Sequence, residues 1–109
     1  MAKIINISDK LSQDKPKIII GEKEYEVSVG MNVVLEFEEL LSESTTENMM
    51  KAVELALGSE AVAEIGVKTM SLENFKVLTI AILASMQDLE YAEAEARFQK
   101  VEQQQGILV

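Results

Sequence analysis

The first sixteen residues combine a short apolar stretch with a polar connection. Residues 3–7 are rich in β-branched isoleucine, and residues 8–16 carry Ser, Asp and Lys together with Pro16. β-Branched residues favour strands, whereas Ser, Asp and Pro are typical of solvated loops. The pattern predicts an N-terminal strand and loop over residues 1–16. The alternative is that residues 3–7 form a tail leading into the next strand.

Residues 17–27 have the pattern of a β-hairpin. Two stretches of strand-forming residues lie on either side of a turn at residues 21–23, which contains a glycine. Alternation along the second stretch places Tyr25 and Val27 on the inward face and the glutamates between them in water. Because an isolated hairpin is only marginally stable, its apolar side must pack on another element.

From Met31 onward the apolar positions recur every three to four residues, which predicts a helical region over residues 31–103. Thr45 or Thr46 and, further on, Ser71 are suited to cap helix N-termini. The expected helices span residues 31–41, 46–57, 59–65, 72–86 and 89–103.

The helix at residues 72–86 is apolar on most sides, which is typical of a helix enclosed by other elements. Its apolar run over residues 77–86 has half of the roughly 20 residues that a bilayer-spanning helix needs, so a membrane anchor is not predicted. At Gln87 and Asp88 the chain either bends or continues straight. Residues 89–103 have a weaker apolar pattern, and residues 104–109 are expected to form a flexible tail.

These elements predict one domain over residues 1–109 in the α+β class. We expect a mostly helical fold, in which an N-terminal β-hairpin or small sheet packs against three to five helices.

The charge of the chain limits the classes of partner that are expected. With 19 acidic and 10 basic residues, the formal net charge is −9. Such a field repels phosphate backbones and anionic membrane surfaces, so neither nucleic acid nor a membrane is an expected partner. The absence of cysteine excludes disulfides and thiol nucleophiles, and it is compatible with a reducing cytoplasm.

Catalytic and cofactor chemistry finds little support in the residues. Histidine is absent, and the five glycines are isolated, so neither an imidazole base nor a phosphate-binding loop is present. Acidic residues do gather on the hairpin and after residue 87, but these positions fit a solvated surface better than a cleft. We expect a noncatalytic protein without a metal or cofactor.

Methionines are the more informative residue type. Five of the six lie in or beside expected helices, where flexible thioethers either fill the core or form a surface that repacks around partners. Both interpretations stay open for each position. The five are Met31, Met49, Met50, Met70 and Met86.

Residues 18–98 resemble the tail assembly chaperones of long-tailed phages and prophages of Gram-positive bacteria. The stretches that carry the resemblance are GEKEYEVSVGMNVVLEFEELLSES, ALGSEAVAEIG and MSLENFKVLTIAILASMQDLEYAEAEARF. Their markers are the strand with Tyr25 and Val27, the helix containing Phe37, the break at Gly58, and the helix start at Ser71. These are patterns of apolar positions and of residues that begin or end helices.

The resemblance implies a cytoplasmic protein of the bacterial host that is absent from the mature virion. Its expected partners are the tape measure protein, which it coats, and the tail tube protein, whose subunits it helps to recruit. Such proteins are often made in two lengths by ribosomal frameshifting. The adaptable apolar contacts that coating requires also suggest a homo-oligomer, while the negative charge would keep the complex soluble.

Apolar residues outside the most convincing core are the candidate contact positions for this partner. They occur in the last expected helix and in the tail, where intramolecular packing and fraying are the competing explanations. The candidates are Leu89, Ala92, Phe98, Ile107, Leu108 and Val109.

A second functional hypothesis follows from the charge alone. An acidic inhibitor that mimics DNA would bind a basic host protein, and it requires carboxylates spaced like phosphates over one surface. An enzyme is the third class, and it requires a concave pocket with converging acids.

Overall fold

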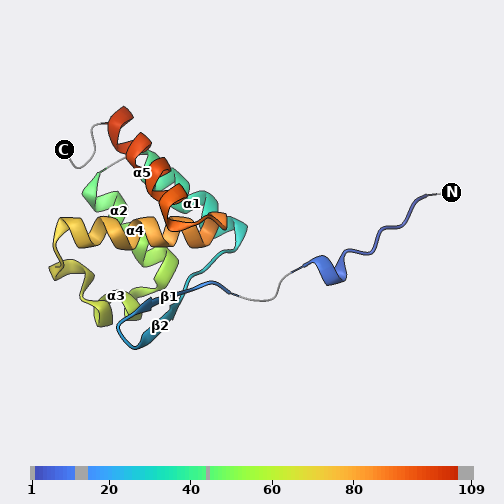
Figure 1. The fold of residues 1–109 in the computed structure, drawn as a ribbon, viewed down its shortest axis with the longest axis horizontal. Coiled ribbons are helices and arrows are strands. Elements are labelled where there is room, and N and C mark those ends of the chain that lie inside the picture. Colours follow the sequence, from blue (N-terminus) through green and yellow to red (C-terminus); the bar gives the residue numbers. More distant parts are fainter. Residues whose placement is uncertain (1, 12–14, 44, 106–109) are drawn as a thin grey trace.

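The computed structural model describes residues 2–11, 15–43 and 45–105, and side chains only as far as residue 100. Two strands and five α-helices make up the domain, which confirms the α+β class with mostly helical content (Figure 1). In chain order the elements are η1 (Ser8–Lys10), β1 (Lys17–Ile20), β2 (Lys23–Glu26), α1 (Met31–Ser42), α2 (Thr46–Leu57), α3 (Ser59–Ile65), η2 (Val67–Thr69), α4 (Leu72–Gln87) and α5 (Tyr91–Gln105).

The predicted hairpin is confirmed. β1 pairs antiparallel with β2, and Gly21 makes the turn with a φ of 64°, a conformation that glycine adopts without steric cost. Val27 is fully buried and Tyr25 is half-buried, as the alternation predicts. The backbone N–H of Ser28 donates to the carbonyl of Ala56 at 2.9 Å, which joins the end of the hairpin to α2.

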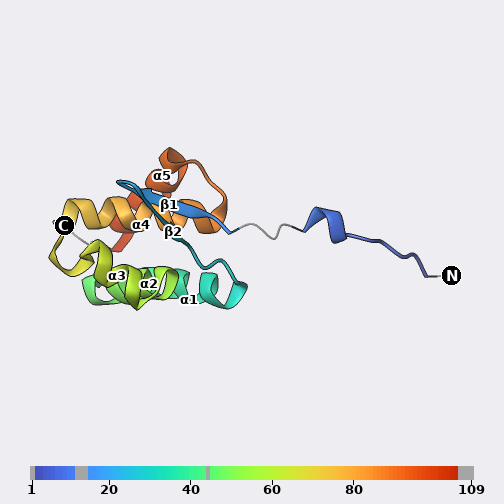
Figure 2. The same cartoon turned by 90° about the horizontal axis from the view of Figure 1, so that it is seen from below.

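The predicted strand at residues 3–7 is wrong. This segment is not paired with any strand, and it projects from the domain (Figures 1 and 2). Strand propensity reflects how well side chains pack on a paired, half-buried surface, and the described residues offer this segment no such surface.

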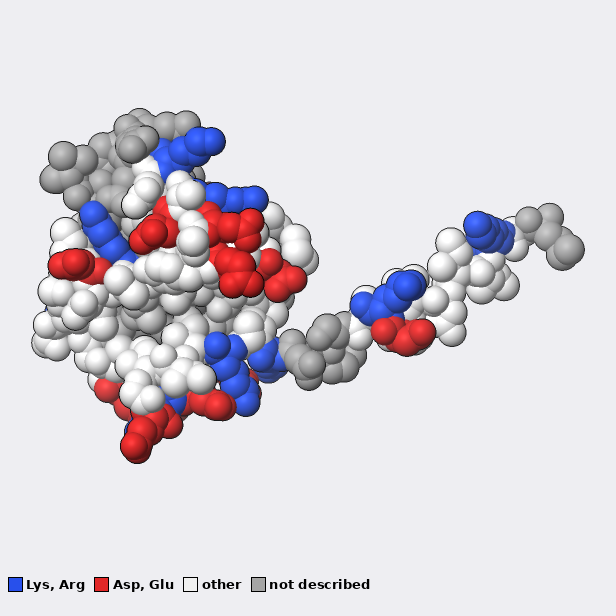
Figure 3. All heavy atoms as spheres, viewed as in Figure 1, with Lys and Arg blue, Asp and Glu red and all other residues white. Residues whose placement is uncertain are grey.

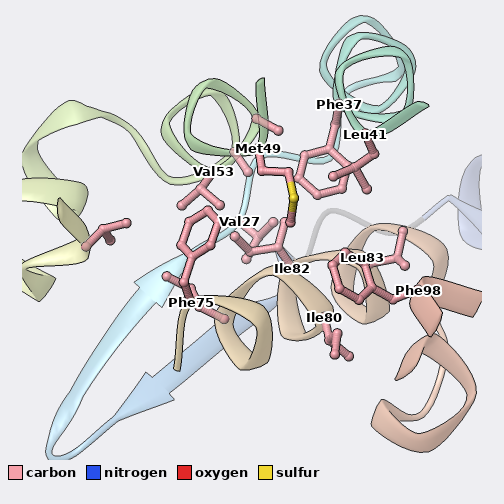
Figure 4. Close-up of a cluster of buried hydrophobic side chains, with 14 of the residues drawn as sticks. Val27, Phe37, Leu41, Met49, Val53, Phe75, Ile80, Ile82, Leu83 and Phe98 are labelled. Carbon is pink, nitrogen blue, oxygen red and sulfur yellow. The ribbon is translucent and has the colours of Figure 1, made fainter. Parts of the chain in front are cut away.

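The helices form two layers with the core between them. Figure 2 shows α1, α2 and α3 in one layer and α4 and α5 in the other, with the hairpin along one side. Side chains from both layers and from the end of the hairpin meet in the core (Figure 4). Its largest fully buried members are Phe37, Phe98, Met49, Ile82, Val27, Val53 and Thr79.

Polar capping groups set the ends of the helices. Thr45 Oγ1 accepts from the N–H of Asn48 at 3.0 Å, and Ser71 Oγ accepts from the N–H of Asn74 at 3.1 Å, so both predicted caps are present. The hydroxyl of Thr79 is buried in α4 and donates to the carbonyl of Phe75 at 2.9 Å. The one polar side chain that α4 buries in the core therefore has a hydrogen-bond partner.

α4 is the central core helix that its apolar pattern predicts. Six of its residues are buried, whereas Leu72 and Val77 remain 47% and 48% exposed. Among the described residues, no helix is long and apolar enough to span a bilayer.

The bend between the last two helices occurs at Asp88. Its φ of 52° is left-handed, and its backbone N–H donates to the carbonyl of Ala84, which ends α4. α5 then runs to Gln105, so residues 104–105 of the expected tail are helical. Residues 106–109 lie outside the described residues.

Candidate protein-binding surfaces

The apolar positions singled out in the last helix do not form a common exposed surface. Phe98 is only 2% exposed and belongs to the core, so the premise that it lies outside the core is wrong. Leu89 is half-buried against the same core, while Ala92 is exposed. Ile107, Leu108 and Val109 lie outside the described residues. Of the described candidates, only Ala92 is freely available at the surface.

An apolar groove lies instead where the start of α2, η2 and the start of α4 meet. The Thr45 and Ser71 caps fix the first turns of the two helices, and the short η2 brings Val67 between them. Phe75 is buried at its base, and Leu72 stands exposed beside it. The lining residues are Thr46, Glu47, Met50, Val67, Lys68, Met70, Leu72 and Phe75, around a volume of about 490 Å³.

The chemistry of this groove suits an apolar peptide surface. Met50 and Met70 are half-buried in it, and their unbranched thioether chains adapt their shape to different partners. Glu47 and Lys68 are the charged groups of the lining, one of each sign. An arrangement of apolar walls with few polar groups is the kind of groove that receives the apolar face of a helix.

A second apolar surface lies on the segment before the hairpin. We define the N-terminal arm as residues 2–11, all of which are exposed. Ile4 is 92% exposed and Ile5 69%, and large apolar residues also occur at Ile7 and Leu11. Single exposed apolar residues are normal, but four within eight positions form an unusually apolar stretch.

Charge is distributed unevenly between the two ends of the chain. Residues 1–17 hold four of the ten basic residues and two of the nineteen acidic ones, which gives +2, and the remaining 92 residues carry −11. On the face shown in Figure 3, carboxylates gather around the junction of α4 and α5 and at the hairpin. Uncharged atoms separate these two groups, so this face lacks an unbroken acidic surface.

An ionic cluster joins the hairpin to α3. Lys23 Nζ is paired with Glu64 Oε1, and the hydroxyl of Tyr25 donates to the same oxygen at 3.2 Å. The hydrogen bond from Lys23 lowers the pKa of the Glu64 carboxyl and, in turn, raises the pKa of Lys23. Partial burial, followed by the bond to Glu64, raises the pKa of Tyr25. All three groups are therefore held in structural contacts on the surface.

Carboxylates also line two further grooves. One, of about 370 Å³, contains Glu36 and Glu54 beside Lys51, and both glutamates are exposed residues. The other, of about 490 Å³, contains Glu54 and Lys68. Paired carboxylates that perform acid and base catalysis are usually held in a cleft, whereas both of these glutamates are exposed. The described residues contain no cluster of three or more acidic metal ligands.

Sequence reasoning missed the groove although one signal was present. The sequence pattern indicates that Met50 and Met70 suit adaptable contacts, but it gives no sign that residues 66–70 and Leu72 lie beside them. Because η2 folds Val67 into the interior, the loop becomes one wall of the groove. These residues lie close together only because α2 packs against α4.

Comparisons with protein-family models, with curated proteins and with solved structures give no significant match.

Proposed function

We propose that this protein is a noncatalytic phage tail assembly chaperone that binds the tape measure protein and helps to recruit tail tube subunits. Its partners are those two proteins and further copies of itself, and it acts in the bacterial cytoplasm without entering the mature virion. The resemblance of residues 18–98 motivates the proposal. The groove containing Met50 and Met70 is the single structural observation that carries it.

A chaperone of this kind must hold apolar helical segments without a fixed sequence. The methionine-lined walls meet that need because a thioether side chain changes rotamer at little cost. The exposed half of Leu72 offers apolar area that a bound helix would cover, and removing apolar area from water favours association. The net charge of −9 would keep the coated client soluble.

The competing acidic-inhibitor hypothesis receives less support. It requires carboxylates spread like phosphates over one surface, and on the one face that Figure 3 shows the carboxylates form separate groups. Binding to a basic host protein would also leave the methionine groove without a role.

The test uses two substitutions on α4 that start from nearly equal exposure. Leu72→Glu places a charge at the groove, and Val77→Glu places the same charge on the same helix away from the groove lining. Each variant is coexpressed with apolar helical segments of a tape measure protein from a long-tailed phage. Soluble client and the complex on size exclusion are measured.

We expect the unchanged protein and Val77→Glu to keep the client soluble and to elute with it. Leu72→Glu should weaken the complex by about tenfold or more, since a charge desolvated in an apolar contact costs at least that factor. Insoluble client with the unchanged protein, or equal effects of the two substitutions, would contradict the proposal.

A further inference from the structure

The N-terminal arm contains a strand-forming sequence that has no sheet. Residues 3–7 read KIINI, with three β-branched isoleucines among five residues. Ile4, Ile5 and Ile7 are 92%, 69% and 51% exposed. Side chains of this kind favour a paired and partly covered strand, and the segment has no partner strand among the residues that the structure describes.

Strand β1 packs against α4, and its edge away from β2 forms no backbone hydrogen bond with other described residues. Val27 donates to the carbonyl of Pro16, and the register pairs Ile18 with Tyr25. Because hydrogen-bonded and non-bonded pairs alternate in an antiparallel ladder, the N–H and C=O of Ile19 point away from β2. Within the described part of the chain, Ile19 has no backbone hydrogen bond beyond the ladder. A two-stranded sheet is marginally stable, and an open edge is a template for another strand.

We propose that residues 3–7 of one copy of this chain add as a third strand to the outer edge of β1 in a second copy. Main-chain hydrogen bonds from Ile19 would hold the added strand, as in other cases of strand addition. The side chain of Ile19, which is 69% exposed, would pack across the strands against the isoleucines of the arm.

The direction of the arm favours a second copy over the arm's own hairpin. The arm leaves the domain and runs away from β1 in both views (Figures 1 and 2). The radius of gyration is 15.7 Å, against about 13 Å for a compact chain of this length. The N-terminal arm contains Lys3, Asp9 and Lys10 and carries +1, whereas residues 18–109 carry −11, so the arm is attracted to the acidic body of a copy of the chain.

Reciprocal exchange strengthens this association. If each of two copies gives its arm to the other, the buried apolar surface doubles while translational freedom is lost only once. The inference deepens the self-association included in the proposed function, but it does not involve the tape measure protein.

Proline substitutions in the arm test strand addition by the oligomeric state of the full chain. Ile5→Pro removes a backbone N–H within residues 3–7, and Leu11→Pro makes the same change elsewhere in the arm. Both residues are exposed, so neither variant threatens the fold of the domain. Mass is measured by light scattering and by sedimentation over a dilution series.

The unchanged chain should form a dimer or larger assembly, and Ile5→Pro should raise its dissociation constant by about tenfold or more, while Leu11→Pro changes it by less than about twofold. A chain that stays monomeric at all concentrations would overturn the proposal. So would equal behaviour of the two proline variants.

Cysteine cross-linking tests the position of the contact, because the chain has no native cysteine. Copies carrying Ile5→Cys are mixed with copies carrying Ile19→Cys and are then oxidised. Strand addition predicts mixed dimers in excess of either homodimer. In the double variant at high dilution, a fast disulfide within one chain would show that the arm folds onto its own hairpin and would overturn the proposal.

The two proposals fail separately. If Leu72→Glu has no effect on client binding while Ile5→Pro still produces monomers, the groove proposal fails and the arm proposal stands. If Ile5→Pro leaves the assembly intact while Leu72→Glu abolishes client binding, the arm proposal fails and the groove proposal stands.

Discussion

Phe98 and Asp88 show how single residues fix the end of the fold. Phe98 is almost fully buried, so it anchors α5 to the core through its ring. Asp88 holds a left-handed backbone conformation that turns the chain from α4 toward α5. The ring of Phe98 stabilises the packing of α5, whereas Asp88 adopts a strained backbone conformation that lets the chain turn before α5.

Phe98→Ala should lower the free energy of unfolding by about 3–5 kcal/mol, because it removes a buried ring and leaves a cavity. Chemical denaturation measures this loss. Gln99→Ala, at the neighbouring exposed position, should change stability by less than about 0.5 kcal/mol. If Phe98→Ala weakened partner binding without loss of stability, its role would be at the surface.

Asp88→Gly should stabilise the protein by roughly 0.5–1 kcal/mol. Glycine adopts a positive φ freely, and the substitution also removes a negative charge from the C-terminal end of a helix, where the macrodipole disfavours it. Thermal denaturation should give a higher midpoint. Asp88→Ala removes the same charge without relieving the left-handed backbone, so it should be less stable than Asp88→Gly.

At the scale of elements, the hairpin is stabilised by contacts to two helices. Val27 enters the core, and the N–H of Ser28 bonds to α2 through Ala56. Lys23 and Tyr25 of β2 both bond to Glu64 on α3. A hairpin that would be marginal alone is therefore attached at both ends of β2.

Glu64→Gln should reduce the pH dependence of stability in acid. The pKa of Glu64 is lowered in the folded protein, so its contribution is present above the ordinary value of 4.5 and is lost as pH falls through the lowered folded value. The effect should be small because the cluster is exposed.

The measurement is the free energy of unfolding from neutral pH to below 4.5, for the unchanged protein and the variant. Glu38→Gln, which removes an exposed carboxylate on α1, is the control. The difference in the free energy of unfolding between the unchanged protein and Glu64→Gln should become smaller as pH falls. A gap that widened in acid would contradict the assigned direction of the pKa shift.

Across the whole domain, repulsion among the excess carboxylates opposes the compact folded state. Residues 18–109 carry −11 in a molecule whose two shorter principal extents are 35 and 23 Å. At 0.01 M salt the screening length is about 30 Å, so carboxylates repel one another across the domain, whereas at 0.15 M it is about 8 Å. Added salt should therefore relieve the repulsion.

We expect the urea midpoint of a dilute sample to rise between about 0.01 and about 0.15 M sodium chloride. The double variant Glu38→Gln/Glu39→Gln, which removes two exposed charges, should show a smaller rise. A midpoint that falls with salt would mean that attractive ion pairs outweigh the repulsion.

The sequence by itself determined the local elements. The spacing of apolar residues in α1, α2 and α4 specifies which face is buried, and the Thr45 and Ser71 hydroxyls specify where two helices begin. Glycines mark the ends of α2 and α3 for the same local reason. These features depend on neighbouring residues only, so the α+β class and the hairpin followed from them.

Tertiary structure decided which apolar residues are covered. Phe98 became core and Leu72 stayed half-exposed because helix layers, rather than local spacing, set their distance from the interior. The groove containing Met50 and Met70 exists only where α2 and α4 meet, and residues 3–7 lack a partner strand. Burial and strand pairing join residues distant along the chain, so no local pattern could fix them.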